Sequence, residues 1–217
     1  MINKNIICIY PVDSTTDFLI PLYELLSKFD NFKGYRLVTT DDNIQILKNS
    51  LYDIDSGSIL LFLGHGASHC LYGSNKERIF TLLDLDLLEK FECVFLSCRS
   101  EEFLKQHNEA YIGFGDMPTD YAEVESERTL NDCDYLKGYD SSDIEYYRQQ
   151  IVNIFTDAIN FVGIDSLERL YKSIKLFANK EISRILVNKE NPNYRARADL
   201  LFEWKDEITY HSKTTAI

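Results

Sequence analysis

The chain reads ILLFLGHG from Ile59 to Gly66 and CVFLSCRS from Cys93 to Ser100. Each stretch is a short apolar run that leads into a reactive side chain, the first into His65 and the second into Cys98. Compact apolar runs bounded by glycine or polar residues are typical of strands buried in a parallel sheet. If the two runs are neighbouring parallel strands, their carboxyl ends lie at one edge of the sheet, and we expect His65 and Cys98 to meet there.

Strand and helix patterns alternate around this stretch and predict an α/β fold. Further strands are expected from the apolar runs at residues 5–10, 34–40 and 110–115. Helical spacing of apolar residues predicts a helix that begins near Pro21, one capped by Asp41 and Asp42, one over 76–91 and a short one over 101–107. The helix over 76–91 would join the two central strands by a right-handed crossover and make them parallel. We therefore predict a three-layer domain with a mostly parallel central sheet and helices on both faces.

The second half of the chain opens on an acidic stretch at residues 119–143, which we expect to be a mobile, solvated loop because it has little apolar periodicity. Its acidic residues are Asp120, Glu123, Glu125, Glu127, Asp132, Asp134, Asp140 and Asp143. Two amphipathic helices follow, one capped by residues 141–143 and one from Leu167 to about Val187. We divide the chain into a domain at residues 1–190 and a C-terminal extension at 191–217, a short apolar run with a polar tail that can fray.

Length and composition limit the class of protein. The 217 residues, of which 45% are hydrophobic, suffice for one sizeable core. No run approaches the 18 apolar residues of a membrane span, and the N-terminus lacks a signal-peptide pattern, so we expect a cytoplasmic protein without membrane contact. The net charge of −12 repels phosphate backbones, which argues against nucleic-acid binding. It suits basic partners or basic peptide substrates, unless the acidity serves only solubility.

Cysteine usage indicates neither a disulfide framework nor a structural zinc site. The cysteines are odd in number, scattered and without C-x-x-C pairs; they are Cys8, Cys70, Cys93, Cys98 and Cys133. His65, His69 and Cys70 are close in sequence, but no fourth ligand has a suitable spacing, so we predict no metal. The chain also lacks a phosphate-binding glycine loop, and we predict no cofactor.

Cys98 and His65 form a pair suited to acyl transfer. A cysteine attacks as its thiolate, and an ordinary thiol with a pKa of about 8.5 is mostly protonated at neutral pH. A neighbouring imidazole can take that proton and later donate one to the leaving amine. The backbone amides of Gly66 and Cys98 are candidates for an oxyanion hole, because glycine leaves its N–H open to close approach.

Taken together, an apolar strand before Gly64-His65-Gly66 and an apolar strand before Ser97-Cys98-Arg99-Ser100 resemble the caspase-like cysteine peptidases of clan CD. This group includes caspases, metacaspases, separase and the bacterial CHAT proteases, in which a His-Gly ends one strand and a Cys ends the next. The resemblance covers about residues 5–165. It implies a caspase-like fold and a cysteine endopeptidase with Cys98 as nucleophile and His65 as general acid and base. It further implies a protein substrate and a role in bacterial defence or cell death, with activation by a partner protein or by processing.

The motif departs from that of caspases, which carry Gln-Ala-Cys-Arg-Gly with the histidine about 50 residues upstream. Here the residues at 96–100 are LSCRS and the interval to His65 is shorter, which points to a compact bacterial CHAT-type member. Metacaspases place an acidic residue two positions before the cysteine to bind a basic substrate side chain, where this chain has Leu96. Candidates to supply that charge from elsewhere are Asp116 and Asp120, which otherwise are loop caps after the fifth strand.

Two other classes of function remain open. Cys98 can be an inert buried cysteine and His65 a turn histidine, in which case the chain is a catalytically inactive caspase-like adaptor in a protein complex. A flavodoxin-like or receiver-like domain that binds a small anion at the strand ends is the third class, and the acidic charge and missing phosphate loop argue against it.

Overall fold

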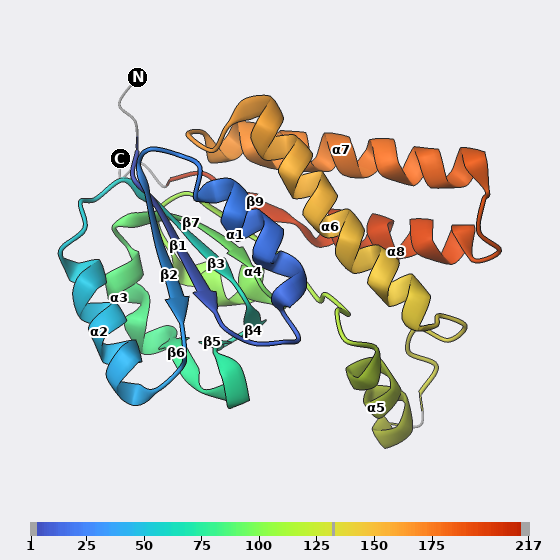
Figure 1. Cartoon of the computed structure of the whole chain (residues 1–217), viewed down its shortest axis with the longest axis horizontal. Coiled ribbons are helices and arrows are strands. Elements are labelled where there is room, and N and C mark those ends of the chain that lie inside the picture. Colours follow the sequence, from blue (N-terminus) through green and yellow to red (C-terminus); the bar gives the residue numbers. More distant parts are fainter. Residues whose placement is uncertain (1–3, 132, 214–217) are drawn as a thin grey trace.

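The computed structural model, which describes residues 4–131 and 133–213, has a central sheet of six strands with helices on both faces (Figure 1). Its strand order is β2-β1-β3-β7-β8-β9, and every pair is parallel except β8 with β9. The strands are β1 (Ile6–Pro11), β2 (Phe32–Leu37), β3 (Ser58–Leu63), β7 (Phe91–Leu96), β8 (Tyr111–Gly113) and β9 (Thr209–His211). The prediction of an α/β fold with a mostly parallel sheet is confirmed.

The two central strands are neighbours, as the apolar runs predict. β3 and β7 pair in parallel, with Leu63 opposite Leu96 at their carboxyl ends. His65 and Cys98 each follow two residues later, so they leave the sheet at the same level. Every residue of β3 is buried, and so is every residue of β7 except Glu92, because helices cover both faces of the sheet.

Helices form a layer on each face of the sheet. Within β1, Cys8 and Tyr10 point to one layer and Ile7 and Ile9 to the other, as the two-residue period of a strand requires. The first layer contains α1 (Ile20–Leu26), α6 (Ser141–Val162), α7 (Leu167–Asn188) and α8 (Tyr194–Glu207). The second contains α2 (Asp41–Tyr52), α3 (Leu85–Leu88) and α4 (Ser100–Phe103). Short 3-10 turns lie at η1 (Asp17–Leu19), η2 (Ser74–Lys76), η3 (Leu82–Asp84) and η4 (Leu104–Gln106).

The helix predicted over 76–91 is wrong. After His65 the chain forms a small antiparallel sheet of β4 (His65–Ala67), β5 (Cys70–Tyr72) and β6 (Arg78–Thr81), and only η3 and α3 follow before β7. A helix cannot start at Lys76, because Asn75 and Lys76 both have left-handed backbone angles, with φ of 58° and 59°. Leu83, which the helical spacing places on the buried face, is 94% exposed.

The acidic stretch is also more ordered than predicted, because it contains the helix α5 (Tyr121–Asn131). The guanidinium of Arg128 donates hydrogen bonds to the carbonyls of Tyr135, Leu136 and Tyr139, which folds the chain back against the end of this helix. Of the acidic residues in the stretch, Asp132 lies outside the described residues.

Two predicted helix caps shift by one residue. Thr40, rather than Asp41 or Asp42, caps α2, because its side chain accepts the amide of Asn43. Asp140 caps α6 in a reciprocal capping box with Asp143.

The extension at 191–217 contains a helix and a strand of the central sheet, where the sequence predicted a short apolar run and a polar tail. It forms α8, which buries Leu200, Leu201 and Trp204, and then β9, which pairs antiparallel with β8. The part of the tail expected to fray, residues 214–217, lies outside the described residues. Among residues 4–131 and 133–213, no helix is long and apolar enough to cross a membrane.

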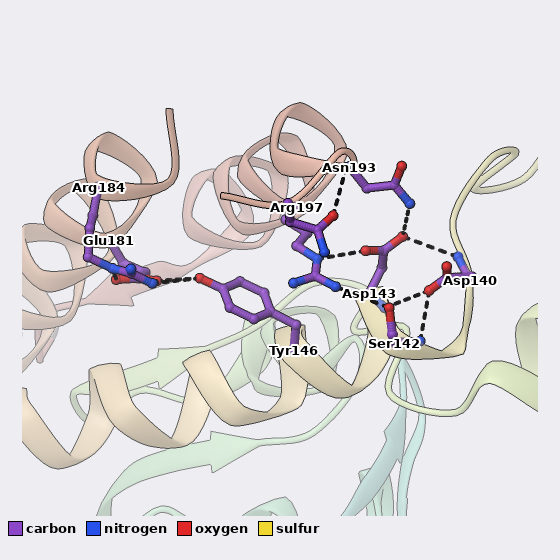
Figure 2. A network of polar contacts seen from close by, with 9 residues as sticks. Asp140, Ser142, Asp143, Tyr146, Glu181, Arg184, Asn193 and Arg197 are labelled. Carbon is purple, nitrogen blue, oxygen red and sulfur yellow. Dashed lines mark hydrogen bonds and ion pairs between the residues drawn. The ribbon is translucent and has the colours of Figure 1, made fainter. Parts of the chain in front are cut away.

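A polar network holds the three C-terminal helices together (Figure 2). The fully buried carboxylate of Asp143 accepts hydrogen bonds from Arg197 at 2.7 Å and from Asn193 at 2.8 Å. Further along α6, Tyr146 donates to Glu181 of α7, which also pairs with Arg184. A buried charge is stable only when it is paired and hydrogen-bonded, so this network fixes the start of α6 against α8.

Candidate active site

A cleft of about 520 Å³ opens at the carboxyl ends of the central strands. Its lining includes four of the predicted site residues, namely His65, Gly66, Cys98 and Asp116. The fifth, Asp120, lines an adjacent cleft of about 370 Å³ that also includes Cys98 and Asp116. Parallel α/β sheets bind ligands beyond the carboxyl ends of their strands, and both clefts lie there.

Cys98 sits in a sharp turn between β7 and α4. Arg99, the next residue, has a left-handed backbone with φ of 52°, and its amide donates to the carbonyl of Gly115 at 2.9 Å. The hydroxyl of Ser100 donates to the carbonyl of Phe95 at 2.6 Å and accepts the amide of Phe114 at 2.9 Å. These bonds tie the turn to the strand before it and to the chain after β8, so the position of Cys98 is set by the sheet.

The surroundings of Cys98 disfavour ionisation of its thiol. Burial raises its pKa to about 11, and the nearby carboxylates of Asp116 and Glu123 act in the same direction. The sulfur donates a hydrogen bond to the carbonyl of Met117 at 3.3 Å. In this arrangement the side chain is a neutral thiol at pH 7.

His65 is anchored through the segment that follows β1. Its Nε2 atom lies 2.7 Å from the hydroxyl of Thr15 and 3.9 Å from a carboxylate oxygen of Asp13. The same oxygen of Asp13 accepts the amide of Thr15 at 2.9 Å and its hydroxyl at 2.7 Å. Burial acts to raise the pKa of Asp13, but the hydrogen bonds from Thr15 and the neighbouring His65 hold it below its usual range.

This network assigns the imidazole tautomer. The single hydroxyl proton of Thr15 is donated in a hydrogen bond to the carboxylate of Asp13. Towards His65, the hydroxyl oxygen of Thr15 can therefore only accept a hydrogen bond, which Nε2–H of the imidazole donates. The lone pair of the neutral ring is then on Nδ1. Thr15 and Asp13 therefore determine which nitrogen of His65 can act as a base.

Asp13 and Thr15 are functional candidates that the sequence reasoning missed. The segment after residue 10 reads PVDST, and we did not predict that its residues contribute to the site. These two residues could have been found from the predicted strand before them. β1 is parallel to β3 and lies next to it, so the polar residues that follow β1 are at the same edge of the sheet as His65.

Gly66 lies against the turn that carries Cys98. A Cβ atom at Gly66 would come within 2.6 Å of the hydroxyl oxygen of Ser97 and 2.7 Å of the carbonyl oxygen of Cys98. Only glycine permits this approach of β4 to the turn. Within the described ranges the amide of Cys98 donates to no backbone carbonyl, whereas the amide of Arg99 donates to the carbonyl of Gly115.

The other histidines and cysteines differ in place: Cys133 is exposed and lines the adjacent cleft together with Cys98. His69 is exposed, Cys70 is fully buried, and Cys8 and Cys93 are core residues. In the part of the chain that the structure describes, no group of three or more His, Cys, Asp or Glu side chains could hold a metal ion.

Comparison of the chain with models of protein families, with curated proteins and with solved structures finds no significant match.

Proposed function

We propose that this protein is a cysteine endopeptidase of the caspase-like type, closest in design to the compact bacterial CHAT proteases. The observation that carries the proposal is the shared cleft of Cys98 and His65, which follow adjacent parallel strands at the same level, with His65 anchored by Thr15 and Asp13. Reactive cysteine and histidine side chains in one cleft, with a third group that orients the base, are the arrangement that acyl transfer needs.

Each residue has a role in the proposed reaction. Nδ1 of His65 takes the proton of the Cys98 thiol, and the thiolate attacks the carbonyl carbon of the scissile peptide bond. The resulting oxyanion is stabilised by the amide of Cys98 together with that of Gly66. The imidazolium then protonates the leaving amine, and water hydrolyses the thioester with His65 as the base. The carboxylate of Asp13, relayed through Thr15, stabilises the imidazolium during both steps.

The substrate that suits this site is a polypeptide with a basic residue next to the scissile bond. Cys98 borders the cleft that contains Asp116, Asp120, Glu123 and Glu127, and none of the described residues that line this cleft is an arginine or a lysine. An arginine or lysine side chain placed there would gain charge-assisted hydrogen bonds. The net charge of −12 would also attract such a substrate.

The proposed biological setting is a bacterial defence or cell-death response in the cytoplasm, in which a partner protein or processing activates the enzyme. This setting is supported by the resemblance of the His-Gly and Cys segments to the CHAT proteases. The neutral, partly exposed thiol of Cys98 is consistent with an enzyme that needs activation.

A catalytically inactive caspase-like adaptor is the second candidate function. It is favoured by the same thiol, whose pKa of about 11 and hydrogen bond to Met117 both oppose attack. The two functions differ in whether Cys98 can be acylated.

A mechanism-based probe separates them. We expect a peptidyl acyloxymethyl ketone with arginine next to the reactive carbonyl to label Cys98, and His65→Ala to abolish the labelling. His69→Ala, which removes an exposed histidine four residues away, is the matched control and should label as the parent does. Equal labelling in both histidine variants, or no labelling of the parent at high probe concentration, would contradict the peptidase and support the inactive adaptor.

A further inference from the structure

Cys98 lies at the junction of two clefts. The cleft of about 370 Å³ is lined by four carboxylates and, among the described residues, by no lysine or arginine. The cleft of about 520 Å³ contains His65 and is bordered by four residues of the segment 72–76, which we call the rim. Figure 1 shows α5, which lines the acidic cleft, and the hairpin of β5 and β6, which carries the rim, well apart from each other at the strand ends.

The side of the larger cleft that contains the rim is basic. Lys76 and Arg99 line the larger cleft but not the acidic one. Asp13 lies on the same side, and its carboxylate already accepts two hydrogen bonds from Thr15. The guanidinium of Arg99 donates to the carboxylate of Glu102 at distances between 2.8 and 3.1 Å. In the part of the chain that the structure describes, no carboxylate pairs with Lys76, so its ammonium is available to a ligand.

The backbone of the larger cleft is strained where these cations are presented. Asn75 and Lys76 have left-handed angles, with φ of 58° and 59°, and Arg99 has φ of 52°. Three of the five described non-glycine residues with positive φ therefore line this one cleft. Left-handed backbone is unfavourable for residues with a Cβ atom, and such strain is concentrated at functional sites, where the surrounding structure maintains it.

Contacts with the central sheet hold the rim in this shape. The hydroxyl of Thr39, a buried residue that follows β2, donates to the carbonyl of Ser74 at 3.3 Å. A Cβ atom at Gly73 would collide with the side chain of Thr39, so the two segments are in close contact. Tyr72 pairs with His65 across β4 and β5. The rim is therefore fixed beside the proposed catalytic base.

The proposed reaction orients a substrate across the two clefts. Because His65 protonates the leaving amine, the residues that follow the scissile bond lie on its side of Cys98, where the rim is. The basic residue that precedes the bond lies in the acidic cleft. An acidic residue after the bond would then meet Lys76, whereas a peptide with these two charges exchanged would place like charges together in both clefts.

We propose that the rim is a binding site for the carboxylate of an aspartate or glutamate that closely follows the scissile bond, with Lys76 as the residue that recognises it. The inference rests on the proposed function and narrows its substrate class to polypeptides with a basic residue before the bond and an acidic residue after it. The ammonium of Lys76 donates a charge-assisted hydrogen bond to the carboxylate. The side-chain amide of Asn75, which also lines the cleft, is a second donor.

Binding of peptides to Cys98→Ala tests this site without any cleavage. The probes are fluorescein-labelled peptides with one arginine and a glutamate at the first, second or third position after it, each paired with the same peptide containing glutamine instead. We expect glutamate to tighten binding about two- to fivefold at one or more positions, which is the strength of an exposed ion pair. The net charge of −12 works against the glutamate peptides, so tighter binding requires a local cation. Lys76→Gln in the same protein should remove the difference, and Lys76→Glu should reverse it.

Lys105→Gln is the matched control, because it removes the same charge from an exposed lysine of η4. The neighbouring His107 contacts the carbonyl of Phe91 at the start of β7, so Lys105 lies at the end of the sheet opposite to the clefts. Equal binding of the glutamate and glutamine peptides, a preference that Lys76→Gln retains or Lys105→Gln removes, or no measurable binding would overturn the inference.

Cleavage by the parent protein separates this inference from the proposed function. A preference for glutamate that depends on Lys76, in a protein that cleaves none of these peptides, would support the site and contradict the peptidase. Cleavage after arginine at equal rates in the glutamate and glutamine peptides, with equal binding, would support the peptidase and contradict the site.

Discussion

The relay from Asp13 through Thr15 to His65 can be tested by removing one oxygen atom. Thr15→Val keeps the shape of the side chain and deletes the hydroxyl that lies 2.7 Å from both Nε2 of His65 and the carboxylate of Asp13. Hydrogen bonds to charged groups contribute about 1.5–3 kcal/mol. If the bond is strongest when the ring is an imidazolium, its loss raises the barrier by about this amount, which corresponds to a rate about 10- to 150-fold lower.

The assay is the second-order rate constant for labelling of Cys98 by the arginyl acyloxymethyl ketone. We expect Thr15→Ser, which restores the hydroxyl, to recover most of the parent rate. Ser14→Ala is the matched control, because Ser14 is exposed beside Thr15 and should not affect His65.

Two results would refute the relay. One is a Thr15→Val rate within twofold of that of Ser14→Ala. The other is a loss in Thr15→Val that Thr15→Ser shares in full, because a side chain that acts only by packing is not rescued by its hydroxyl.

Three further predictions follow from the described contacts. Gly66→Ala should lower the melting temperature and abolish labelling of Cys98, since the added methyl group meets the backbone of the Cys98 turn at 2.7 Å; an active, equally stable variant would contradict this close approach. Asp120→Asn should slow cleavage of peptides with arginine next to the scissile bond more than cleavage of peptides with glutamine there, and an equal effect on both would exclude recognition by charge. Arg197→Met should lower the free energy of unfolding by about 3–5 kcal/mol because it leaves the buried Asp143 without its counter-charge, whereas Lys172→Met, at an exposed ion pair, should leave the midpoint of the same denaturant titration unchanged.

The central strands and the pairing of their ends could be predicted from sequence. β3 and β7 are continuous apolar runs, and such runs are buried on both faces wherever they occur in a sheet of this class. The two-residue step from Leu63 to His65 and from Leu96 to Cys98 then places both side chains at one edge, because any crossover connection, helical or not, leaves the two strands parallel. This explains why their position was predicted correctly although the connecting helix over 76–91 was not.

The errors have a common physical origin. The apolar residues at 76–91 have the spacing of a helix. The conformation of the segment is nevertheless determined by the left-handed backbone at Asn75 and Lys76 and by the pairing of β6 with β5. In the acidic stretch, α5 is held by the hydrogen bonds of Arg128 to the carbonyls of Tyr135 and Leu136 and by the burial of Val124. None of these partners is visible from local periodicity.

By itself, the sequence determined the α/β class, the buried central strands and the placement of His65 and Cys98 at their ends, because apolar runs indicate burial and a crossover connection makes consecutive strands parallel. Only the tertiary structure decided which groups contact His65 and Cys98 and so determine their protonation. Thr15 and Asp13 reach His65 because β1 lies beside β3, and Met117 reaches Cys98 because the chain after β8 turns back over the sheet edge. A tautomer and a thiol pKa depend on atoms within a few ångströms, and these atoms come from segments that are distant in the chain.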